Sequence, residues 1–403
     1  MVIYNLLILA ILILGVGVCE IKKSRRNDAI FLCAASVLLV TIAALRADTV
    51  GVDYNFVYAP FFKDVCEQGF SFVFSTKNAY FIEISYSLIN YLVSLFTNDV
   101  RILMLVIAMI STALTAVLLY RYCAVPWVGM FVYVAFGFFG NSMSFIRQSL
   151  GIAVFLFALQ FVREKKILPY LLLVLLAATF HKSLLVMLPF YFLARIPLNW
   201  KSLLSYSAIT ALIMIFSWQL FYFVTDTLGL FSFYNTFQGM YYMNPRNWQT
   251  AAVPVLCGIA AVILAKLLLK RNPKNLVYVN FAVFGALLYV LTCKHFLFQR
   301  FAVMFFTAAI LFVPEMCALP LEEIETEQSA EAAEPKPANT KAKKKLEKQA
   351  AIQEKELKRR LANRKYYYYD AVGATVVIGF LYNLFLLYAN RINLVPYITW
   401  FQQ

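Results

Sequence analysis

The chain has 403 residues, 62% of them hydrophobic, and its mean hydropathy is +0.72. A soluble domain of this length is far less apolar, so the composition indicates an all-α, polytopic membrane protein. The net charge of +15 does not point to nucleic acid. Most basic residues lie in short loops beside apolar runs, where they set membrane orientation. The seven cysteines are scattered, which suggests neither a disulfide framework nor a zinc site.

Apolar runs of spanning or nearly spanning length predict about twelve transmembrane helices. The predicted ranges are 2–19, 29–45, 102–120, 126–140, 145–162, 167–180, 184–196, 203–225, 251–269, 276–293, 301–318 and 371–388. The first run lacks a basic start and its charges come afterwards, which favours a retained helix over a signal peptide. Placing the basic run 22–26 in the cytoplasm puts the amino terminus outside.

Three regions follow from this topology. They are a membrane core (1–320), a charged cytoplasmic linker (321–370), and a last transmembrane helix with an outer tail (371–403). The core carries two large outer loops, 46–101 and 226–250.

One segment of the first outer loop, 80–96, is apolar enough to span but contains Glu83 and Asn90. A crossing there would invert the orientation of everything that follows. We therefore expect a helix lying along the membrane surface, on which Glu83 is an exposed acid.

The stretch 144–183 reads as two apolar helices joined by the charged turn 163–166. Arg147 lies about 24 Å before this turn and His181 about 22 Å after it, because a helix rises about 1.5 Å per residue. With a hydrocarbon core roughly 30 Å thick, both residues should lie slightly inside the outer face and share one recess. Alone, each has an ordinary explanation, which is snorkelling for Arg147 and a structural hydrogen bond for His181.

The first outer loop opens with a concentration of polar residues that includes Arg46, Asp48, Asp53 and Tyr54. Gly51 permits a backbone turn that would aim Asp53 back toward the membrane. A carboxylate there suits the deprotonation of a hydroxyl nucleophile, although loop solvation or helix capping would equally account for one acid.

Further cations and polar groups fall on the same side: Gln148, Lys182, Ser183, Arg246, Lys294 and Arg300. Arginines bind phosphate oxygens bidentately, so several around a shallow recess suit a lipid-bound diphosphate. No HExxH, GxSxG, P-loop or Cys/His ligand spacing occurs, which argues against zinc and against a serine nucleophile. We predict no metal and no cofactor, although a divalent ion held by Asp48 or Asp53 stays an alternative.

Three stretches resemble one family of membrane proteins. They are RADTVGVDYNFVY (46–58), FIRQSLGIAVFLFAL (145–159) and LLLVLLAATFHKSLLVMLP (171–189), with a looser likeness in FLFQRFAVMFF (296–306). They resemble the EpsG family of exopolysaccharide gene clusters, which is related to Wzy-type polysaccharide polymerases. The family's polar positions correspond here to Arg46, Asp53, Tyr54, Arg147, Gln148, His181 and Ser183.

The resemblance implies a polymerase in the bacterial cell membrane, with a GT-C-like fold, that joins oligosaccharide repeat units carried on undecaprenyl diphosphate. The expected partners are the lipid-linked oligosaccharide, membrane lipids and other polysaccharide-assembly proteins. In this interpretation Arg147 and Arg300 hold the departing diphosphate with support from Lys182, and Asp53 is favoured over His181 as the base. The expected substrate-binding residues are Arg46, Tyr54, Gln148, Lys182, Ser183, Arg246 and Arg300.

Two other functions stay open. A glycan ligase or single-sugar transferase that uses a polyprenyl-phosphate donor would have a similar site. A transporter of lipid-linked glycans would also be long and polytopic, but transporters usually bring polar groups to the membrane midplane, whereas the charges here lie near the outer face.

Overall fold

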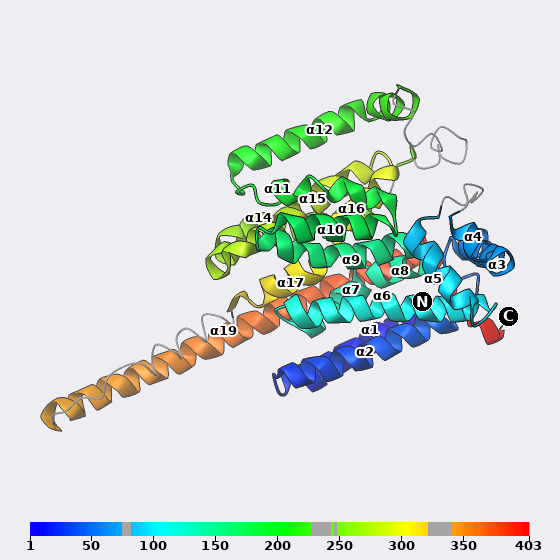
Figure 1. Cartoon of the computed structure of the whole chain (residues 1–403). Coiled ribbons are helices and arrows are strands. Elements are labelled where there is room, and N and C mark those ends of the chain that lie inside the picture. The colour runs from blue at the N-terminus through cyan, green and yellow to red at the C-terminus, as the bar shows by residue number, and fades with distance from the viewer. Residues whose placement is uncertain (75–81, 228–242, 246–247, 321–339, 403) are drawn as a thin grey trace.

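The computed structural model describes residues 1–74, 82–227, 243–245, 248–320 and 340–402, with the backbone alone from 340 to 362. All regular elements in these ranges are helical, apart from one isolated bridge between Arg46 and Thr399. The long helices lie side by side, and both chain termini lie at the same end of this array (Figure 1).

The longer helices are α1 (Val2–Leu14) with its π-helical continuation η1 (Gly15–Glu20), α2 (Arg25–Leu45), α6 (Val100–Tyr122), α9 (Ile146–Arg163), α12 (Trp200–Tyr222), α14 (Ala252–Arg271), α15 (Leu276–Thr292) and α19 (Thr340–Ala389). The shorter ones are α3 (Ala59–Gln68), α4 (Phe70–Val73), α5 (Ile84–Ser94), α7 (Pro126–Ala135), α8 (Phe138–Ser144), α10 (Ile167–Ala178), α11 (Phe190–Leu193), α16 (Leu297–Phe306) and α17 (Ala309–Cys317).

The prediction of twelve spans is wrong in number. Within the described ranges, eight helices are long and apolar enough to cross a membrane, and a ninth crossing is obtained if α16 and α17, bent by 43°, are counted as one. The protein is therefore a multi-pass, all-α membrane protein with eight or nine candidate spans.

Three predicted spans are shorter or broken helices. The range 126–140 is interrupted at Gly137, whose φ of +84° is a left-handed conformation that favours glycine, and α7 ends there after ten residues. The range 184–196 contains a 3₁₀ turn, η3 (Lys182–Met187), then Pro189 and the four-residue α11. The range 167–180 forms only the twelve-residue α10. All ten residues of α7 are buried, so this apolar run is accounted for by packing inside the protein.

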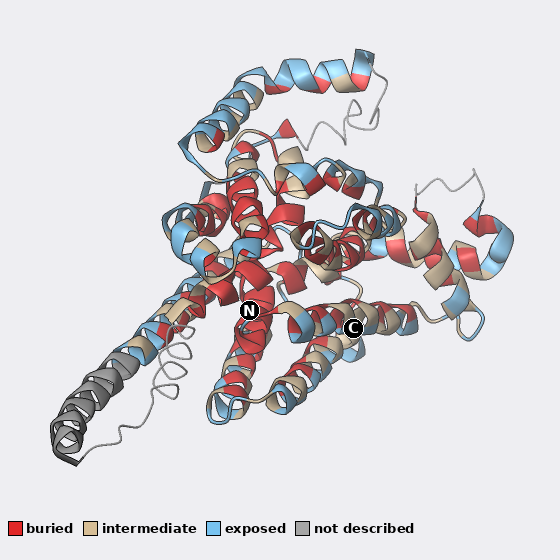
Figure 2. Ribbon diagram, turned by 60° about the vertical axis from the view of Figure 1, so that its left-hand side comes forward, coloured by how far each residue is buried: buried red, intermediate tan, exposed pale blue. Residues whose placement is uncertain are grey.

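Burial is concentrated at the centre of the molecule (Figure 2). The outlying helix α12 instead exposes large apolar side chains, including Leu204, Ile209, Leu212 and Ile215. An apolar surface of this kind is expected where a helix contacts lipid, because its backbone polar groups are already satisfied within the helix.

The loop that follows α2 packs against the carboxyl-terminal tail. The amide of Ala47 donates to the carbonyl of Ile398 at 2.7 Å, and the amide of Gly51 donates to Asn393 at 2.9 Å. Gly51 has φ +108°, and a Cβ there would lie 2.8 Å from the Met143 carbonyl oxygen, so only glycine fits this turn.

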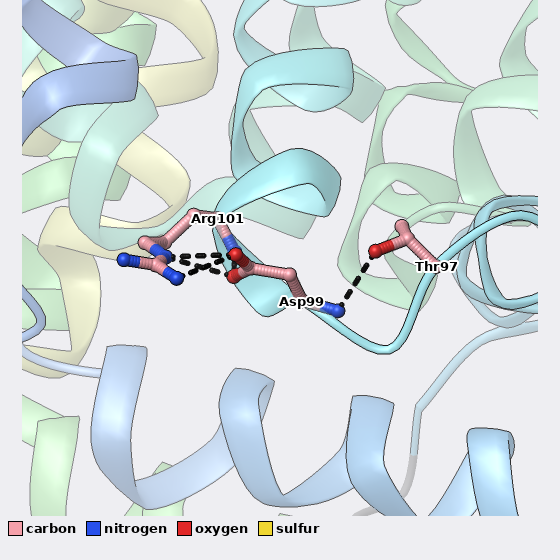
Figure 3. Close-up of polar contacts among 3 residues, drawn as sticks. All are labelled: Thr97, Asp99 and Arg101. Carbon is pink, nitrogen blue, oxygen red and sulfur yellow. Dashed lines mark hydrogen bonds and ion pairs between the residues drawn. The ribbon is translucent and has the colours of Figure 1, made fainter.

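The loop ends where α6 begins at an N-cap (Figure 3). Asp99 Oδ1 accepts from the amide of Arg101 at 2.9 Å, and the Arg101 guanidinium binds the same carboxylate. Thr97 Oγ1 accepts from the Asp99 amide at 3.0 Å. This cap fixes the start of the span. It also engages Arg101, which takes no part in the polar cluster described below.

At the opposite end of the array, α19 extends well beyond the other helices (Figure 1). It runs without interruption from Thr340 through residue 370, the predicted boundary between linker and last span. The candidate span covers Asn363–Ala389.

Candidate functional site

A buried carboxylate, Glu83, joins three segments that are far apart in sequence. Its Oε2 forms an ion pair with Nη1 of Arg147 on α9. Its Oε1 accepts from the backbone amide of Lys182 at 3.1 Å and lies 3.3 Å from Nδ1 of His181. The Glu83 side chain is only 7% exposed. Glu83, Arg147 and His181 are called the Glu83 cluster below.

Local structure places each member of the cluster. Glu83 is the extended residue preceding α5, and Arg147 lies in the first turn of α9. His181 follows the end of α10, in extended backbone before η3. The start of α5 is fastened to the end of α10, because the Ser85 amide donates to the Thr179 carbonyl at 3.0 Å. Arg147 and His181 therefore come together, with Glu83 between them.

The charge state of the cluster follows from its contacts. Burial acts to raise the pKa of Glu83, but the His181 imidazole, the Arg147 charge and the Lys182 amide outweigh it and lower this pKa to about 2. Burial lowers the pKa of His181, against the opposing pull of Glu83. At neutral pH the cluster therefore holds an ionised Glu83, a cationic Arg147 and a neutral imidazole.

Asp53 and Arg300 adjoin the Glu83 cluster. Asp53 immediately precedes the π-helical turn η2 (Tyr54–Tyr58). Burial raises the pKa of Asp53, and the charges of Arg300 and Arg147 act against that rise, which places both guanidinium groups within electrostatic reach of it. Arg300 on α16 is tied to α9, because Gln148 Nε2 donates to the Arg300 carbonyl at 2.5 Å. Two arginines, two carboxylates and one imidazole thus come together from five segments.

The side chains of the other predicted site residues have different contacts. Arg46 is buried in a packed corner, where Nη1 donates to the Met143 carbonyl at 2.8 Å and the guanidinium lies 5.7 Å from the Tyr54 ring centre. These contacts give Arg46 and Tyr54 a role in packing the loop. Lys182 exposes its side chain and reaches the cluster through its backbone amide. The Ser183 hydroxyl is buried without a hydrogen-bond partner among the described residues, and Arg246 lies outside them.

The prediction that Glu83 is an exposed acid is wrong, because its side chain is buried and paired with Arg147. The available signal was an acid inside an otherwise apolar stretch, because a carboxylate there is costly unless it is paired. Among the described residues no group of three or more His, Cys, Asp and Glu is placed to hold a metal ion. The cationic side chains at this site are those of Arg147 and Arg300.

The EpsG family model matches residues 29–324, which is well over half of the chain and includes every residue of the group around Glu83. The chain belongs to the EpsG family. Membership of the EpsG family implies a part in exopolysaccharide biosynthesis. The matched residues end before α19 begins. No curated protein and no solved structure matches the chain.

Proposed function

We propose that this EpsG-family protein is a membrane glycosyltransferase that polymerises lipid-linked oligosaccharide repeat units. The observation that carries the proposal is the buried Glu83 cluster with Asp53 and Arg300 beside it, at the end of the helical array opposite the extension of α19. We propose that this end faces outward in the bacterial cell membrane and that the helices form a GT-C-like arrangement.

In the proposed reaction, a hydroxyl of the acceptor glycan attacks the anomeric carbon of the donor glycan. The new glycosidic bond forms as the bond from that carbon to the diphosphate oxygen breaks, and the hydroxyl proton passes to a base. Negative charge grows on the departing undecaprenyl diphosphate. Preorganised cations in a poorly hydrated site stabilise that charge best, and this is the role proposed for Arg147 and Arg300, with Lys182 in support.

Glu83 orients this machinery. It holds one nitrogen of the Arg147 guanidinium and so fixes the plane in which the remaining N–H groups point. Its other oxygen lies beside Nδ1 of His181, which orients the imidazole. An arginine held in advance loses less conformational freedom when it binds diphosphate oxygens.

Asp53 is the proposed base. Burial raises the pKa of its carboxyl group while Arg300 and Arg147 oppose the rise, and a carboxylate of raised pKa accepts a proton more readily. His181 is the second candidate, because a carboxylate beside Nδ1 stabilises the imidazolium formed by proton uptake. Asp53→Asn should therefore remove turnover but preserve binding of the lipid-linked donor, whereas His181→Gln should retain measurable activity. An active Asp53→Asn protein beside an inactive His181→Gln protein would reverse the assignment.

The direct test is incubation of the purified protein with a lipid-linked repeat unit. A polymerase yields a ladder of longer glycans, with one lipid diphosphate released for each bond formed. A single added unit without a ladder would identify a ligase or single-sugar transferase. Movement of the substrate across a vesicle bilayer without any new bond would identify a transporter.

A further inference from the structure

A cavity with about 70 Å³ of internal space is lined mostly by apolar atoms, with several polar side chains among them. The break between α7 and α8 forms one wall, and α15, α16 and the end of α19 complete it. Its polar and aromatic lining includes Asn141, Tyr289, Gln299, Tyr382, Asn383 and Arg391. It is called the amide cavity below. A space of this size holds several waters or part of a small polar ligand.

Two polar atoms in the amide cavity are buried and have no hydrogen-bond partner among the described residues. They are the donor Nδ2 of Asn383 and the acceptor Oε1 of Gln299. Asn383 is only 5% exposed. Buried polar groups are almost always paired, so an unpaired donor and an unpaired acceptor in one cavity point to a ligand that can both accept and donate. A hydroxyl group does both.

The rest of the lining suits a neutral, hydroxyl-rich ligand. Arg391 is the only charged residue among those that form the wall, and four carboxamide and five aromatic side chains lie there beside aliphatic ones. The Tyr382 hydroxyl is already used, because it donates to the Thr250 carbonyl at 2.7 Å, so this residue presents chiefly its ring. A sugar combines an apolar ring face with hydroxyl groups, whereas a diphosphate would require the arginines found around Glu83.

The amide cavity is connected to the Glu83 cluster through neighbouring residues. Gln299 directly precedes Arg300 on α16. Asn141 also lines a smaller cavity of about 30 Å³, and Gln148 lies in the wall of that cavity. The Gln148 amide donates to the Arg300 carbonyl, so Asn141 and Gln148 link the walls of the two cavities to the helix that carries Arg300.

We propose that the amide cavity binds a sugar ring of the acceptor glycan and that Gln299 and Asn383 recognise its hydroxyls. This assignment rests on the proposed function and adds to it a second binding site, chemically different from the site for the lipid diphosphate. The cavity would hold the acceptor while its reactive hydroxyl faces the donor beside Asp53.

Saturation-transfer NMR on the full chain in lipid nanodiscs tests the assignment without requiring turnover. The probes are the methyl glycosides of glucose, galactose and N-acetylglucosamine. At least one should receive saturation from the wild-type protein, and Asn383→Leu and Gln299→Met should each weaken this signal at least about tenfold, since each variant loses one hydrogen-bonding group of the site. Asn363→Leu, an exposed asparagine on the same helix, is the matched control and should retain the signal.

Thermal unfolding excludes a trivial loss of fold. Replacing a buried, unpaired amide with a hydrocarbon of similar size should leave the melting temperature of Asn383→Leu equal to or above that of the wild type. The assignment would be overturned if no glycoside received saturation, or if both cavity variants transferred as much saturation as the wild type. A large drop in the melting temperature of Asn383→Leu would also overturn it. If the cavity assignment failed but the wild-type protein still produced a glycan ladder, the polymerase proposal would be unaffected. If glycosides bound but no ladder formed, only the polymerase proposal would be refuted.

Discussion

Two buried glutamates lie at opposite ends of the helices, and their partners differ in kind. Glu83 is held by the guanidinium of Arg147, the imidazole of His181 and one backbone amide. Glu20, at the end of η1, accepts from Trp127 Nε1 at 2.9 Å and from the Tyr368 hydroxyl. Lys23 lies 3.6 Å from the second oxygen of Glu20.

We propose that this difference separates a reactive arrangement from a structural one. Around Glu20, neutral donors from α7 and α19 both bind Oε1 and Lys23 approaches Oε2, and the Tyr368 contact fastens the last helix to the first. Around Glu83, the acid holds cationic and titratable groups that have chemistry of their own. The group around Glu83 also lies entirely within the residues matched by the EpsG family model, whereas Glu20 and Tyr368 lie outside them. A buried acid therefore indicates a site by the partners that it positions, because burial alone is common to both.

The largest effect on activity is expected from Arg147→Lys. Lysine keeps the charge and the pairing with Glu83, so expression and melting temperature should stay near wild type. It loses the planar set of N–H donors of the guanidinium group. Removal of one hydrogen-bond donor to the transition state typically lowers turnover about 100-fold or more. Lys165→Arg, in the exposed turn after α9, is the matched control and should be silent in the glycan-ladder assay. Full activity of Arg147→Lys would mean that Arg147 has only a structural role, like the partners of Glu20.

Glu83→Gln should show the largest loss of stability. The pKa of Glu83 falls from 4.5 to about 2 on folding, which corresponds to about 3 kcal/mol of stabilisation at neutral pH. Because the folded-state pKa is depressed, this stabilisation is complete above 4.5 and is lost as the pH falls toward 2. Unfolding of wild type and variant should therefore differ at neutral pH and converge in acid. A constant difference across that range would show that the carboxylate is not held by its charge.

Tyr368→Phe should have the smallest effect, confined to stability. The substitution leaves buried Glu20 one donor short, which costs about 1–3 kcal/mol. Thermal unfolding should report this loss, while the glycan ladder should stay within about twofold of wild type. A strong fall in turnover would mean that the attachment of α19 reaches the site, and the distinction between the two glutamates would no longer hold.

The sequence predicted the helical class and most long spans, because extended apolar runs leave few other structures in a membrane. It overestimated the number of spans where apolar residues fill the interior of the protein. The ten buried residues of α7 are as hydrophobic as a lipid-facing segment. The break at Gly137 depends on a left-handed backbone conformation that an apolar run does not reveal.

For the site, helical rise and the short turn between the two helices predicted that Arg147 and His181 would lie near each other, and in the structure both contact Glu83. Glu83 was not predicted because its partners lie 64 and 98 residues further along the chain, and sequence spacing says nothing about such contacts. Binding by Arg46 stays a prediction, because the structure shows only that its guanidinium donates to the Met143 carbonyl and to the Met104 sulfur.

The central claim is that the arginines beside Glu83 hold the diphosphate of the lipid carrier. Native mass spectrometry of the purified protein with undecaprenyl diphosphate measures this directly. We expect the wild type and Lys165→Arg to retain the lipid, and Arg147→Lys and Arg300→Gln each to bind it at least about tenfold more weakly, since each loses a bidentate phosphate contact. Equal lipid occupancy in all four proteins would contradict the claim.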